Sequence, residues 1–167
     1  MSEVHIRHAE RDDLPRIVEI YNATIASREV TADTEPVSIE SRVAWFEAHR
    51  PDSRPLWVAE SVSAIEGWLS LSTFYGRPAY DGTAELSVYV ATHRRRRGLG
   101  SMLMRHALAQ APALGVDALI GFIFRHNPRS LRLFHNHGFE RWGLLPAVAV
   151  LDGTPRDVII VGRKLAA

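Results

Sequence analysis

The hydrophobic pattern of the first 71 residues predicts a strand, two helices and a hairpin. Residues 4–8 are expected to form a short strand. The helix after it has Asp12 or Asp13 as its cap, Pro15 in its first turn, and an apolar face of Leu14, Ile17, Val18, Tyr21 and Ile25. Residues 29–37 are polar and predict a loop, and Ser38 is expected to cap a second helix that carries Val43, Trp45 and Phe46. Two apolar runs, 56–60 and 65–71, predict the hairpin.

Strands and helices alternate in the second half of the chain. Residues 73–82 form a loop that is too long for a simple turn, and strands are predicted at 83–90 and 118–124. The helix expected between them, from 98 to 114, should be kinked or shortened by Pro112, because proline removes a backbone donor. Asn127 and Pro128 begin another helix, which Gly138 ends near His137, and strands near 139–145 and 158–163 follow. The order β-α-α-β-β-β-α-β-α-β-β predicts an α/β fold, a mixed central sheet with helices on both faces.

Length and charge restrict the class of protein. The 167 residues are expected to form one domain over residues 1–167. With 20 basic and 19 acidic residues the net charge is +1, which argues against a dedicated nucleic-acid binder. No apolar run approaches the roughly 18 residues that span a bilayer, and residues 1–5 lack the features of a signal peptide. The absence of cysteine removes thiol nucleophiles and cysteine–zinc sites. We therefore expect a cytoplasmic protein with no membrane and no nucleic-acid partner.

The most informative segment is residues 86–100, LSVYVATHRRRRGLG. A β-branched strand leads into four arginines and then into Gly98 and Gly100 at the start of a helix. Glycines let the backbone approach a ligand closely, and the first helical N–H groups have no internal partners, so this turn favours an anion such as a pyrophosphate. The arginines add charge-assisted contacts. The competing interpretations are a solvated basic turn and a targeting or nucleic-acid patch. A dinucleotide fold is disfavoured because the third glycine of its motif is absent.

Two spaced motifs resemble those of the GCN5-related N-acetyltransferase (GNAT) family. Arg95-x-x-Gly98-x-Gly100 is similar to the Q/R-x-x-G-x-G/A signature. Asn127-x-x-Ser130, followed by Phe134 and then Gly138-Phe139, is similar to the next motif, N-x-x-S…Y-x-x-x-G-F. Residues 79–90, 34–36 and 45–46 resemble the phosphinothricin and methionine sulfoximine acetyltransferase branch. The resemblance covers nearly the whole chain and implies the GNAT (acyl-CoA N-acyltransferase) fold.

The resemblance implies an acetyl-CoA site beside the strand that precedes the glycine turn. Val88, Tyr89 and Val90 would offer backbone groups to the pantetheine arm, much as in β-augmentation. The pyrophosphate would be held by Arg95, Arg96, Arg97, Gly98, Leu99, Gly100 and Ser101. Asn127 and Ser130 would contact the CoA arm, although Asn127 is also explained as a plain helix cap, and the two roles are compatible.

Glu85 is the candidate catalytic residue. It lies in an otherwise apolar strand, on the same face as Ser87 and Tyr89 by alternation. Burying an unpaired carboxylate is costly, so its presence needs an explanation. Its match to the A-E-x-x-V-Y-V pattern of the branch implies a general base that takes a proton from the amine, directly or through water. The alternative is an edge-strand or salt-bridged glutamate. A general acid is not assigned, because Phe134 stands where the family has tyrosine or histidine and His135 lies about 100° round the helix.

The resemblance places the acceptor next to the loop before Glu85. The implied acceptor-binding residues are Tyr75, Gly76, Arg77, Glu85, Leu86 and Ser87. Arg77 would pair with a carboxylate of the acceptor, and a solvent-facing loop arginine is the alternative. Residues 135–137, His-Asn-His, point apart on a helix and have no carboxylate beside them, so no metal is expected.

Together these features predict direct transfer of acetyl from acetyl-CoA to the α-amine of a small amino acid or analogue. Phosphinothricin, methionine sulfoximine and methionine sulfone are examples, and their acetylation would detoxify them. One alternative is acetylation of a protein N-terminus or a lysine by the same fold. Another is a CoA-binding sensor that has lost catalysis, for which Phe134 argues. A basic-loop RNA-binding module is a more distant alternative. The resemblance also implies a homodimer.

Overall fold

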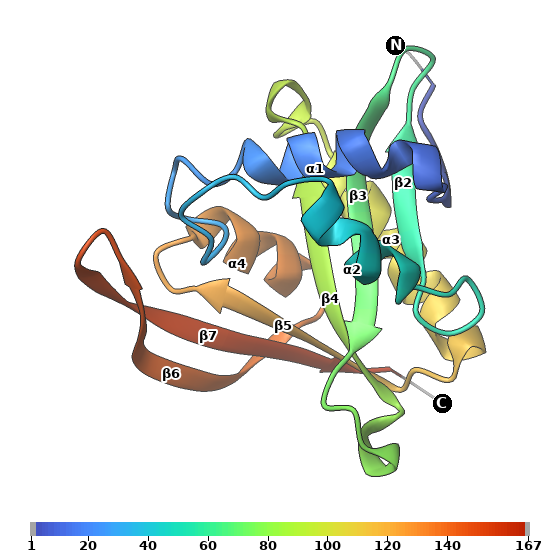
Figure 1. Cartoon of the computed structure of the whole chain (residues 1–167). Coiled ribbons are helices and arrows are strands. Elements are labelled where there is room, and N and C mark those ends of the chain that lie inside the picture. Colours follow the sequence, from blue (N-terminus) through green and yellow to red (C-terminus); the bar gives the residue numbers. More distant parts are fainter. Residues whose placement is uncertain (1–2, 166–167) are drawn as a thin grey trace.

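A seven-stranded sheet forms the centre of the computed structural model, which describes residues 3–165 (Figure 1). Its strands are β1 (His5–His8), β2 (Leu56–Glu60), β3 (Ile65–Thr73), β4 (Thr83–Val90), β5 (Ala118–Phe124), β6 (Glu140–Leu151) and β7 (Thr154–Lys164). They lie in the order β1-β2-β3-β4-β5-β7-β6, with β4 and β5 parallel and the other neighbours antiparallel. The predicted mixed sheet is confirmed, as is the hairpin of β2 and β3.

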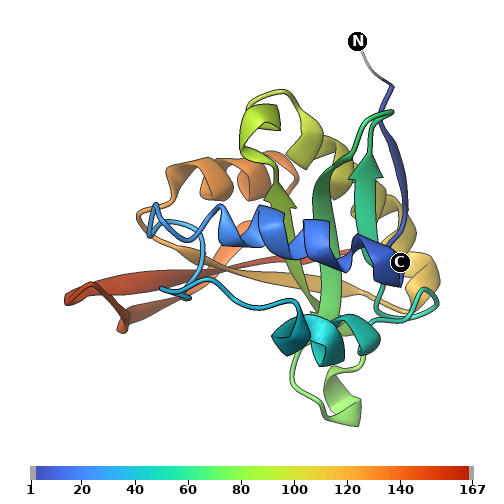
Figure 2. The same ribbon diagram turned by 45° about the horizontal axis from the view of Figure 1, so that its top comes forward.

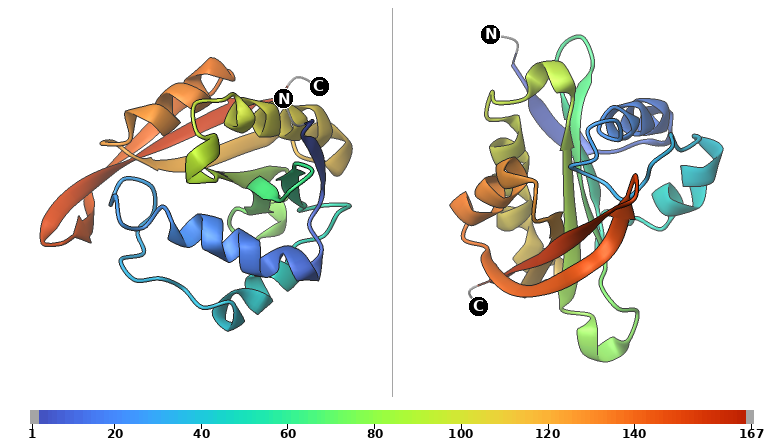
Figure 3. Two further views of the ribbon diagram at one scale, coloured as in Figure 1. Left: turned by 90° about the horizontal axis from the view of Figure 1, so that it is seen from above. Right: turned by 90° about the vertical axis from the view of Figure 1, so that its left-hand side faces the viewer.

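Helices cover both faces of this sheet, as predicted. α1 (Leu14–Asn22) and α2 (Val43–Glu47) lie on one face, and α3 (Leu99–Gln110) and α4 (Pro128–Asn136) lie on the other (Figure 3). Short 3₁₀ turns join the elements: η1 (Arg11–Asp13), η2 (Glu40–Arg42), η3 (Pro78–Tyr80), η4 (Thr92–Arg94) and η5 (Ala111–Leu114). Within residues 3–165, none of the helices has the length and hydropathy needed to cross a membrane.

Alternation along β4 divides its side chains between the two faces. Leu86 is buried in the main core against α3, and Val88 packs against the same cluster. Leu103 and Met104 of α3 are fully buried there. Burying a side chain of this size contributes about 1.5–3 kcal/mol, so this contact fixes α3 against the sheet. The alternate positions Glu85, Ser87 and Tyr89 turn to the face that α1 and α2 cover.

The ends of α3 and α4 follow the signals in the sequence. α3 ends at Gln110 and passes into a 3₁₀ turn that contains Pro112, whose missing N–H cannot continue an α-helix. Asn127 caps α4, because its side-chain oxygen accepts the N–H of Ser130 at 3.2 Å. Gly138 follows the helix with a φ of 82°, in the left-handed region that glycine tolerates.

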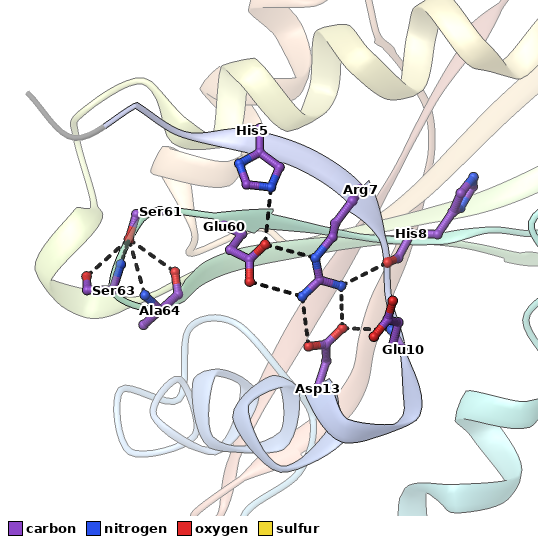
Figure 4. Close-up of polar contacts among 9 residues, drawn as sticks. All are labelled: His5, Arg7, His8, Glu10, Asp13, Glu60, Ser61, Ser63 and Ala64. Carbon is purple, nitrogen blue, oxygen red and sulfur yellow. Dashed lines mark hydrogen bonds and ion pairs between the residues drawn. The ribbon is translucent and has the colours of Figure 1, made fainter.

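Asp13 stands at the N-cap position of α1, but its carboxylate does not cap that helix. It accepts two hydrogen bonds from the Arg7 guanidinium, at 2.8 and 3.0 Å, and one from the N–H of Glu10 at 2.7 Å (Figure 4). The same guanidinium donates to Glu60 at 2.9 and 3.2 Å. Burial alone would raise the pKa of Asp13, but the hydrogen bonds from Arg7 and Glu10 hold that pKa below its ordinary value. Arg7 thereby ties β1 to β2 and to the start of α1.

β6 and β7 extend further than the sequence predicts, by residues 146–151 and 154–157. They form a hairpin that projects beyond the rest of the sheet (Figure 1). The added residues are largely exposed, and the register shifts between Leu145 and Ala149, next to Pro146. A proline at an irregular position of an edge strand leaves no regular apolar alternation, which is why the pattern missed this part.

The long segment between α1 and α2 reaches across to this hairpin (Figure 2). Nε of Arg28 donates to Asp152 in the hairpin turn at 2.8 Å. Nε2 of His126, just after β5, donates to the carbonyl oxygen of Arg28 at 2.7 Å. These contacts hold the segment beside the carboxyl end of β5.

Candidate active site

β4 and β5 separate halfway along their length. In the described chain their parallel pairing covers residues 83–85 and 118–120 and stops there, although β4 continues to Val90. Residues 86–90 therefore have backbone groups on the β5 side without a strand partner. A cavity of about 760 Å³, here called the larger cavity, is lined by this part of β4, by the start of α3 and by α4.

Glycine is favoured at two positions beside the larger cavity. Gly98 precedes α3 with a φ of 80°, in the left-handed region that other residues rarely adopt. A Cβ on Gly100 would lie 3.2 Å from Cδ2 of Leu133, so this glycine lets α3 approach α4 closely. The first N–H groups of α3 have no partner within the helix. Because Gly98 to Ser101 line the cavity, these donors and the positive end of the helix favour an anion there.

Basic side chains crowd the same cavity. Arg94, Arg95 and Arg96 enter it from the turn before α3, and Arg129 and Arg132 enter it from α4. Burial and then the charge of Arg129 lower the pKa of Arg95. Nε of Arg94 is buried and makes no hydrogen bond to the described residues. Cations that repel one another beside an unsatisfied donor fit a polyanionic ligand such as a pyrophosphate.

Most of the predicted cofactor residues lie together around the larger cavity. Those that line it are Val88, Tyr89, Val90, Arg95, Arg96, Gly98, Leu99, Gly100, Ser101, Asn127 and Ser130. Arg97 is exposed and lies outside it. The amide of Asn127 is engaged in capping α4 and also donates to the Ser130 hydroxyl at 3.0 Å. The helix-cap explanation of Asn127 is therefore confirmed, and the residue still borders the cavity.

A second cavity of about 330 Å³, here called the smaller cavity, lies on the α1 and α2 side of the sheet. Its lining residues are Ile17, Val18, Tyr21, Val37, Arg42, Trp45, Trp68, Ser70, Ser72, Glu85, Ser87 and Tyr89. Apolar and aromatic walls with a few convergent polar groups are typical of a small-molecule site.

Glu85 presents its carboxylate to the smaller cavity. It lies opposite Ser72 in the β3–β4 ladder, so both side chains point to the same face. Its carboxylate makes no ion pair with the described residues, and β4 is an interior strand, so the salt-bridge and edge-strand explanations do not apply there. Burial raises the pKa of Glu85. A carboxylate with a raised pKa is a stronger base than an exposed one, and it is suited to accept a proton from an amine.

Tyr89 lines both cavities. Its ring stacks on Trp68 with 4.5 Å between centroids and meets Tyr21 edge-on at 5.2 Å. Burial and the neighbouring Tyr21 raise the pKa of Tyr89, so its hydroxyl stays protonated. The two cavities therefore share Tyr89 as a lining residue, and Glu85 lies four residues before it on the same face of β4.

The sequence model of the Acetyltransferase (GNAT) family matches residues 16–139. The chain belongs to the GNAT family. It is 52% identical over 162 residues to YwnH of Bacillus subtilis, provisionally assigned as a phosphinothricin acetyltransferase, with 96% of this chain and 99% of that protein covered. An L-methionine sulfoximine/L-methionine sulfone acetyltransferase of Pseudomonas paraeruginosa is 33% identical over 161 residues, with 96% and 94% covered. A phosphinothricin acetyltransferase of Sinorhizobium meliloti, solved with acetyl-CoA, superposes with a TM-score of 0.91 at 29% identity, and 99% and 90% of the two chains are covered.

The protein is thus an acetyltransferase with the GNAT fold. The larger cavity fits the CoA part of acetyl-CoA on physical grounds. Unpaired β4 backbone can hydrogen-bond an extended amide chain, and the α3 N–H groups and arginines can hold phosphates. The smaller cavity, with its aromatic walls and few polar groups, is of a kind that can hold a small molecule.

Three predicted acceptor residues of this GNAT chain lie away from both cavities. Tyr75, Gly76 and Arg77 are exposed on the loop after β3. The rings of Phe74, Tyr75 and Tyr80 pack against one another there, with centroids 5.3 to 5.9 Å apart. These three rings pack within the loop itself, and the loop residues Tyr75, Gly76 and Arg77 do not line the smaller cavity. An acceptor role for Arg77 stays a prediction.

The acceptor-binding residues predicted on β4 lie on opposite faces of the strand. Glu85 and Ser87 line the smaller cavity, whereas Leu86 is buried on the α3 side. A contact between the Leu86 side chain and an acceptor in that cavity is therefore excluded, because the strand turns successive side chains to opposite faces.

Phe134 is a core residue in this GNAT protein. It is buried against Phe139, with 4.9 Å between ring centroids, and a Cβ on Gly121 would lie 2.9 Å from its ring. A phenyl ring in this position transfers no proton. His135 next to it is exposed. In the part of the chain that the structure describes, no three His, Cys, Asp or Glu side chains are grouped to hold a metal.

The sequence interpretation missed several lining residues. Arg129 and Arg132 could have been found, because basic residues at helical spacing follow the Asn127 motif on α4. Tyr21 and Arg42 carried no such signal. Tyr21 reaches the smaller cavity because α1 packs against β3 and β4, and Arg42 reaches it because the segment between α1 and α2 folds back to the cavity.

Proposed function

We propose that the protein transfers the acetyl group of acetyl-CoA directly to the α-amine of a small amino acid or amino-acid analogue. One observation carries this proposal: the smaller cavity, which Glu85 lines, and the larger cavity have Tyr89 as a common lining residue. An amine held near Glu85 would lie next to the end of the donor site. Bringing two reactants together in this way supplies a large part of the catalysis.

The reaction requires one proton transfer to a side chain of the protein. Acetyl-CoA supplies an activated thioester, so that the amine nitrogen forms an amide bond while the carbon–sulfur bond breaks. Glu85 accepts the proton that the nitrogen loses, directly or through one water molecule. An α-amine with a pKa of about 7.7–8.0 needs only about 1 kcal/mol to become neutral at pH 7. The sequence has no cysteine, which argues for direct transfer without a thioester on the protein.

No residue is assigned as a general acid. Phe134 is buried in the core and carries no proton to give. A thiol with a pKa of about 8.5 is a good leaving group as the thiolate, so the reaction does not demand an acid. Lack of an acid at residue 134 is therefore compatible with turnover.

The relatives point to the class of acceptor. YwnH carries a provisional assignment to phosphinothricin, and the Pseudomonas paraeruginosa relative is named for L-methionine sulfoximine and L-methionine sulfone. Each of these compounds has a free α-amine, an α-carboxylate and a small polar side chain. A cavity of about 330 Å³ is of a size to hold molecules of this kind.

The test is acetyl-CoA-dependent thiol release with a panel of amines, followed by mass spectrometry of the products. The panel contains phosphinothricin, methionine sulfoximine, methionine sulfone, the common amino acids and short peptides. Saturable thiol release with formation of an N-acetyl amino acid is the expected result. Acetyl-CoA binding without turnover of any amine would contradict the proposal and favour a sensor. Turnover of peptides in preference to amino acids would favour a protein acceptor.

We also propose that the protein forms a homodimer through the sheet edge at β6. Trp142, Val148 and Val150 on this edge strand are 44%, 57% and 62% exposed, and Phe122 on β5 is 43% exposed. An open edge strand with exposed apolar side chains can pair with a second copy about a two-fold axis. Sedimentation of the wild type as two chains, shifted toward one by Trp142→Ser, is the expected result. A wild type that sediments as one chain at micromolar concentration would contradict it.

A further inference from the structure

Among the described residues that line the smaller cavity, Arg42 is the basic one and Glu85 is the acidic one. Arg42 ends η2 in the segment between α1 and α2, whereas Glu85 lies on β4. The Arg42 side chain is 29% exposed, so solvent screens its charge only in part. A cavity that presents one cation and one anion is complementary to a zwitterion rather than to a neutral or purely cationic amine.

Arg42 is held in place by its neighbours. Its Nη2 donates to Oδ2 of Asp33 at 3.1 Å, and its guanidinium lies 5.0 Å from the centroid of the Tyr21 ring. Asp33 in turn accepts the hydroxyl of Tyr21, which also contacts Thr31. A guanidinium that is already oriented by a carboxylate and an aromatic ring loses less conformational entropy when it binds a ligand.

Donors remain available around this guanidinium. Within residues 3–165, Arg42 makes its hydrogen bond through Nη2, and its Nε and Nη1 have no protein acceptor. The Tyr89 hydroxyl also makes no hydrogen bond to the described residues, and its side chain is half-buried beside the smaller cavity. The Tyr21 ring contacts both side chains. A planar guanidinium with free N–H groups is suited to donate hydrogen bonds to a carboxylate.

We propose that Arg42 binds the α-carboxylate of the acceptor while Glu85 receives its α-amine, so that the enzyme selects free α-amino acids over amides and peptides. The proposal rests on the acetyl transfer proposed above and adds the group that selects the acceptor. The Tyr89 hydroxyl is the second donor to the carboxylate. An amide or a peptide has no charge at this position and leaves the remaining donors of Arg42 without an anionic partner, which disfavours its binding.

Arg77 is the rival for this role. The sequence implies it as the carboxylate partner, but it is exposed on the loop after β3 and lines neither cavity. The two arginines therefore give opposite predictions in the same experiment. Arg50, exposed on the turn after α2, serves as a matched surface control.

The experiment compares two acceptors that differ only at the carboxylate, L-methionine sulfone and its α-carboxamide. The ratio of kcat/KM for the acid to that for the amide is measured on the wild type, Arg42→Gln, Arg77→Gln and Arg50→Gln. Arg42→Gln is expected to lower this ratio by about 10- to 100-fold, mainly through the KM of the acid. Arg50→Gln and Arg77→Gln are expected to keep the wild-type ratio. The amine of the carboxamide has a different pKa from that of the acid. The acid-to-amide ratio of each variant is therefore compared with the ratio of the wild type.

Other outcomes separate the possibilities. If Arg42 only supports the local structure, Arg42→Gln lowers turnover of both acceptors alike and leaves the ratio unchanged, which overturns the proposal. A lowered ratio in Arg77→Gln alone also overturns the proposal and assigns the binding of the carboxylate to the loop after β3. If the wild type turns over neither of these acceptors nor any other amine of the panel, the proposed function fails. In that case the binding of methionine sulfone to the CoA-saturated protein is measured by calorimetry. Binding that is weaker in Arg42→Gln than in the wild type supports the carboxylate site. Equal binding in both proteins, or no binding, overturns it.

Discussion

The larger and smaller cavities share Tyr89, but they are built in opposite ways. The larger cavity draws most of its lining from two short stretches, 88–101 and 127–133, and relies on backbone groups, glycines and arginines. The smaller cavity collects single side chains from α1, the segment after it, α2, β3 and β4. Backbone donors are insensitive to most substitutions, whereas a side-chain wall changes with each one. The acceptor preference can therefore change without disturbing the donor site.

The largest effect is expected at Glu85 in the smaller cavity. Glu85→Gln keeps the shape of the side chain but removes the base, so kcat should fall by about 10²–10⁴-fold. Glu85 works in its ionised form, and burial raises its pKa. In the wild type the rate should therefore decline as the pH falls through that raised pKa, and in Glu85→Gln this part of the pH–rate profile should disappear. The dissociation constant for acetyl-CoA should stay at the wild-type value, and an unchanged profile would remove Glu85 as the base.

A smaller effect, restricted to the donor side, is expected in the arginine turn. Arg95 lies in the larger cavity and Arg97 lies outside it, only two residues away. Arg95→Gln should weaken acetyl-CoA binding by about tenfold, because the phosphate loses a partly buried cationic partner. Arg97→Gln, with the same change of net charge, should alter it by less than about twofold. Calorimetric titration of both variants measures this difference, and equal weakening would show that the turn acts only through its overall charge.

The smallest effect on catalysis is expected for a variant that lies away from both cavities. Arg7→Met leaves the nearly buried Asp13 without its cation and should lower the free energy of unfolding by about 1–2 kcal/mol. Arg11→Met is the control, because its ion pair with Glu47 is exposed on both sides and should contribute less than about 0.5 kcal/mol. Denaturant titration measures both changes, and the two Michaelis constants should not move in either variant.

The pH dependence of this stability has a definite sign. The folded-state pKa of Asp13 lies below its unfolded value, so the stability it contributes is present at neutral pH and is lost as the pH falls through the folded pKa. Arg7→Met removes the hydrogen bonds that lower this pKa. The variant should therefore lose less of its remaining stability on acidification than the wild type. An identical acid response in both proteins would show that the Arg7 contact does not control Asp13.

The sequence was sufficient for the donor half of the site because its signals are local. The position of Gly98 follows from a left-handed backbone before α3, and that of Gly100 from the close approach of Leu133. Both requirements leave glycine at fixed spacing beside the arginines. The strand before them and the helix start at Asn127 were predictable for the same reason, since capping and alternation involve residues close in sequence.

The acceptor half could not be predicted in the same way. Arg42 directly precedes α2, which carries Trp45 and Phe46. Nothing in the sequence around Arg42 distinguishes it from an arginine that faces solvent. Its place beside Tyr21 and Asp33 depends on how a long irregular segment folds over the sheet. Arg77 drew attention because it lies in a long aromatic loop, but the rings of that loop pack on one another. The extension of β6 past Pro146 was missed because exposed edge strands carry little apolar pattern.

The account assigns acetyl-CoA to the larger cavity and the acceptor to the smaller cavity. Two-substrate kinetics test this assignment most directly. Initial rates are measured over a grid of acetyl-CoA and methionine sulfone concentrations for the wild type, Arg95→Gln and Arg42→Gln. The account predicts that Arg95→Gln raises the KM for acetyl-CoA alone and that Arg42→Gln raises the KM for methionine sulfone alone. If either variant raises both constants by the same factor, the two cavities are not separate sites and the account is contradicted.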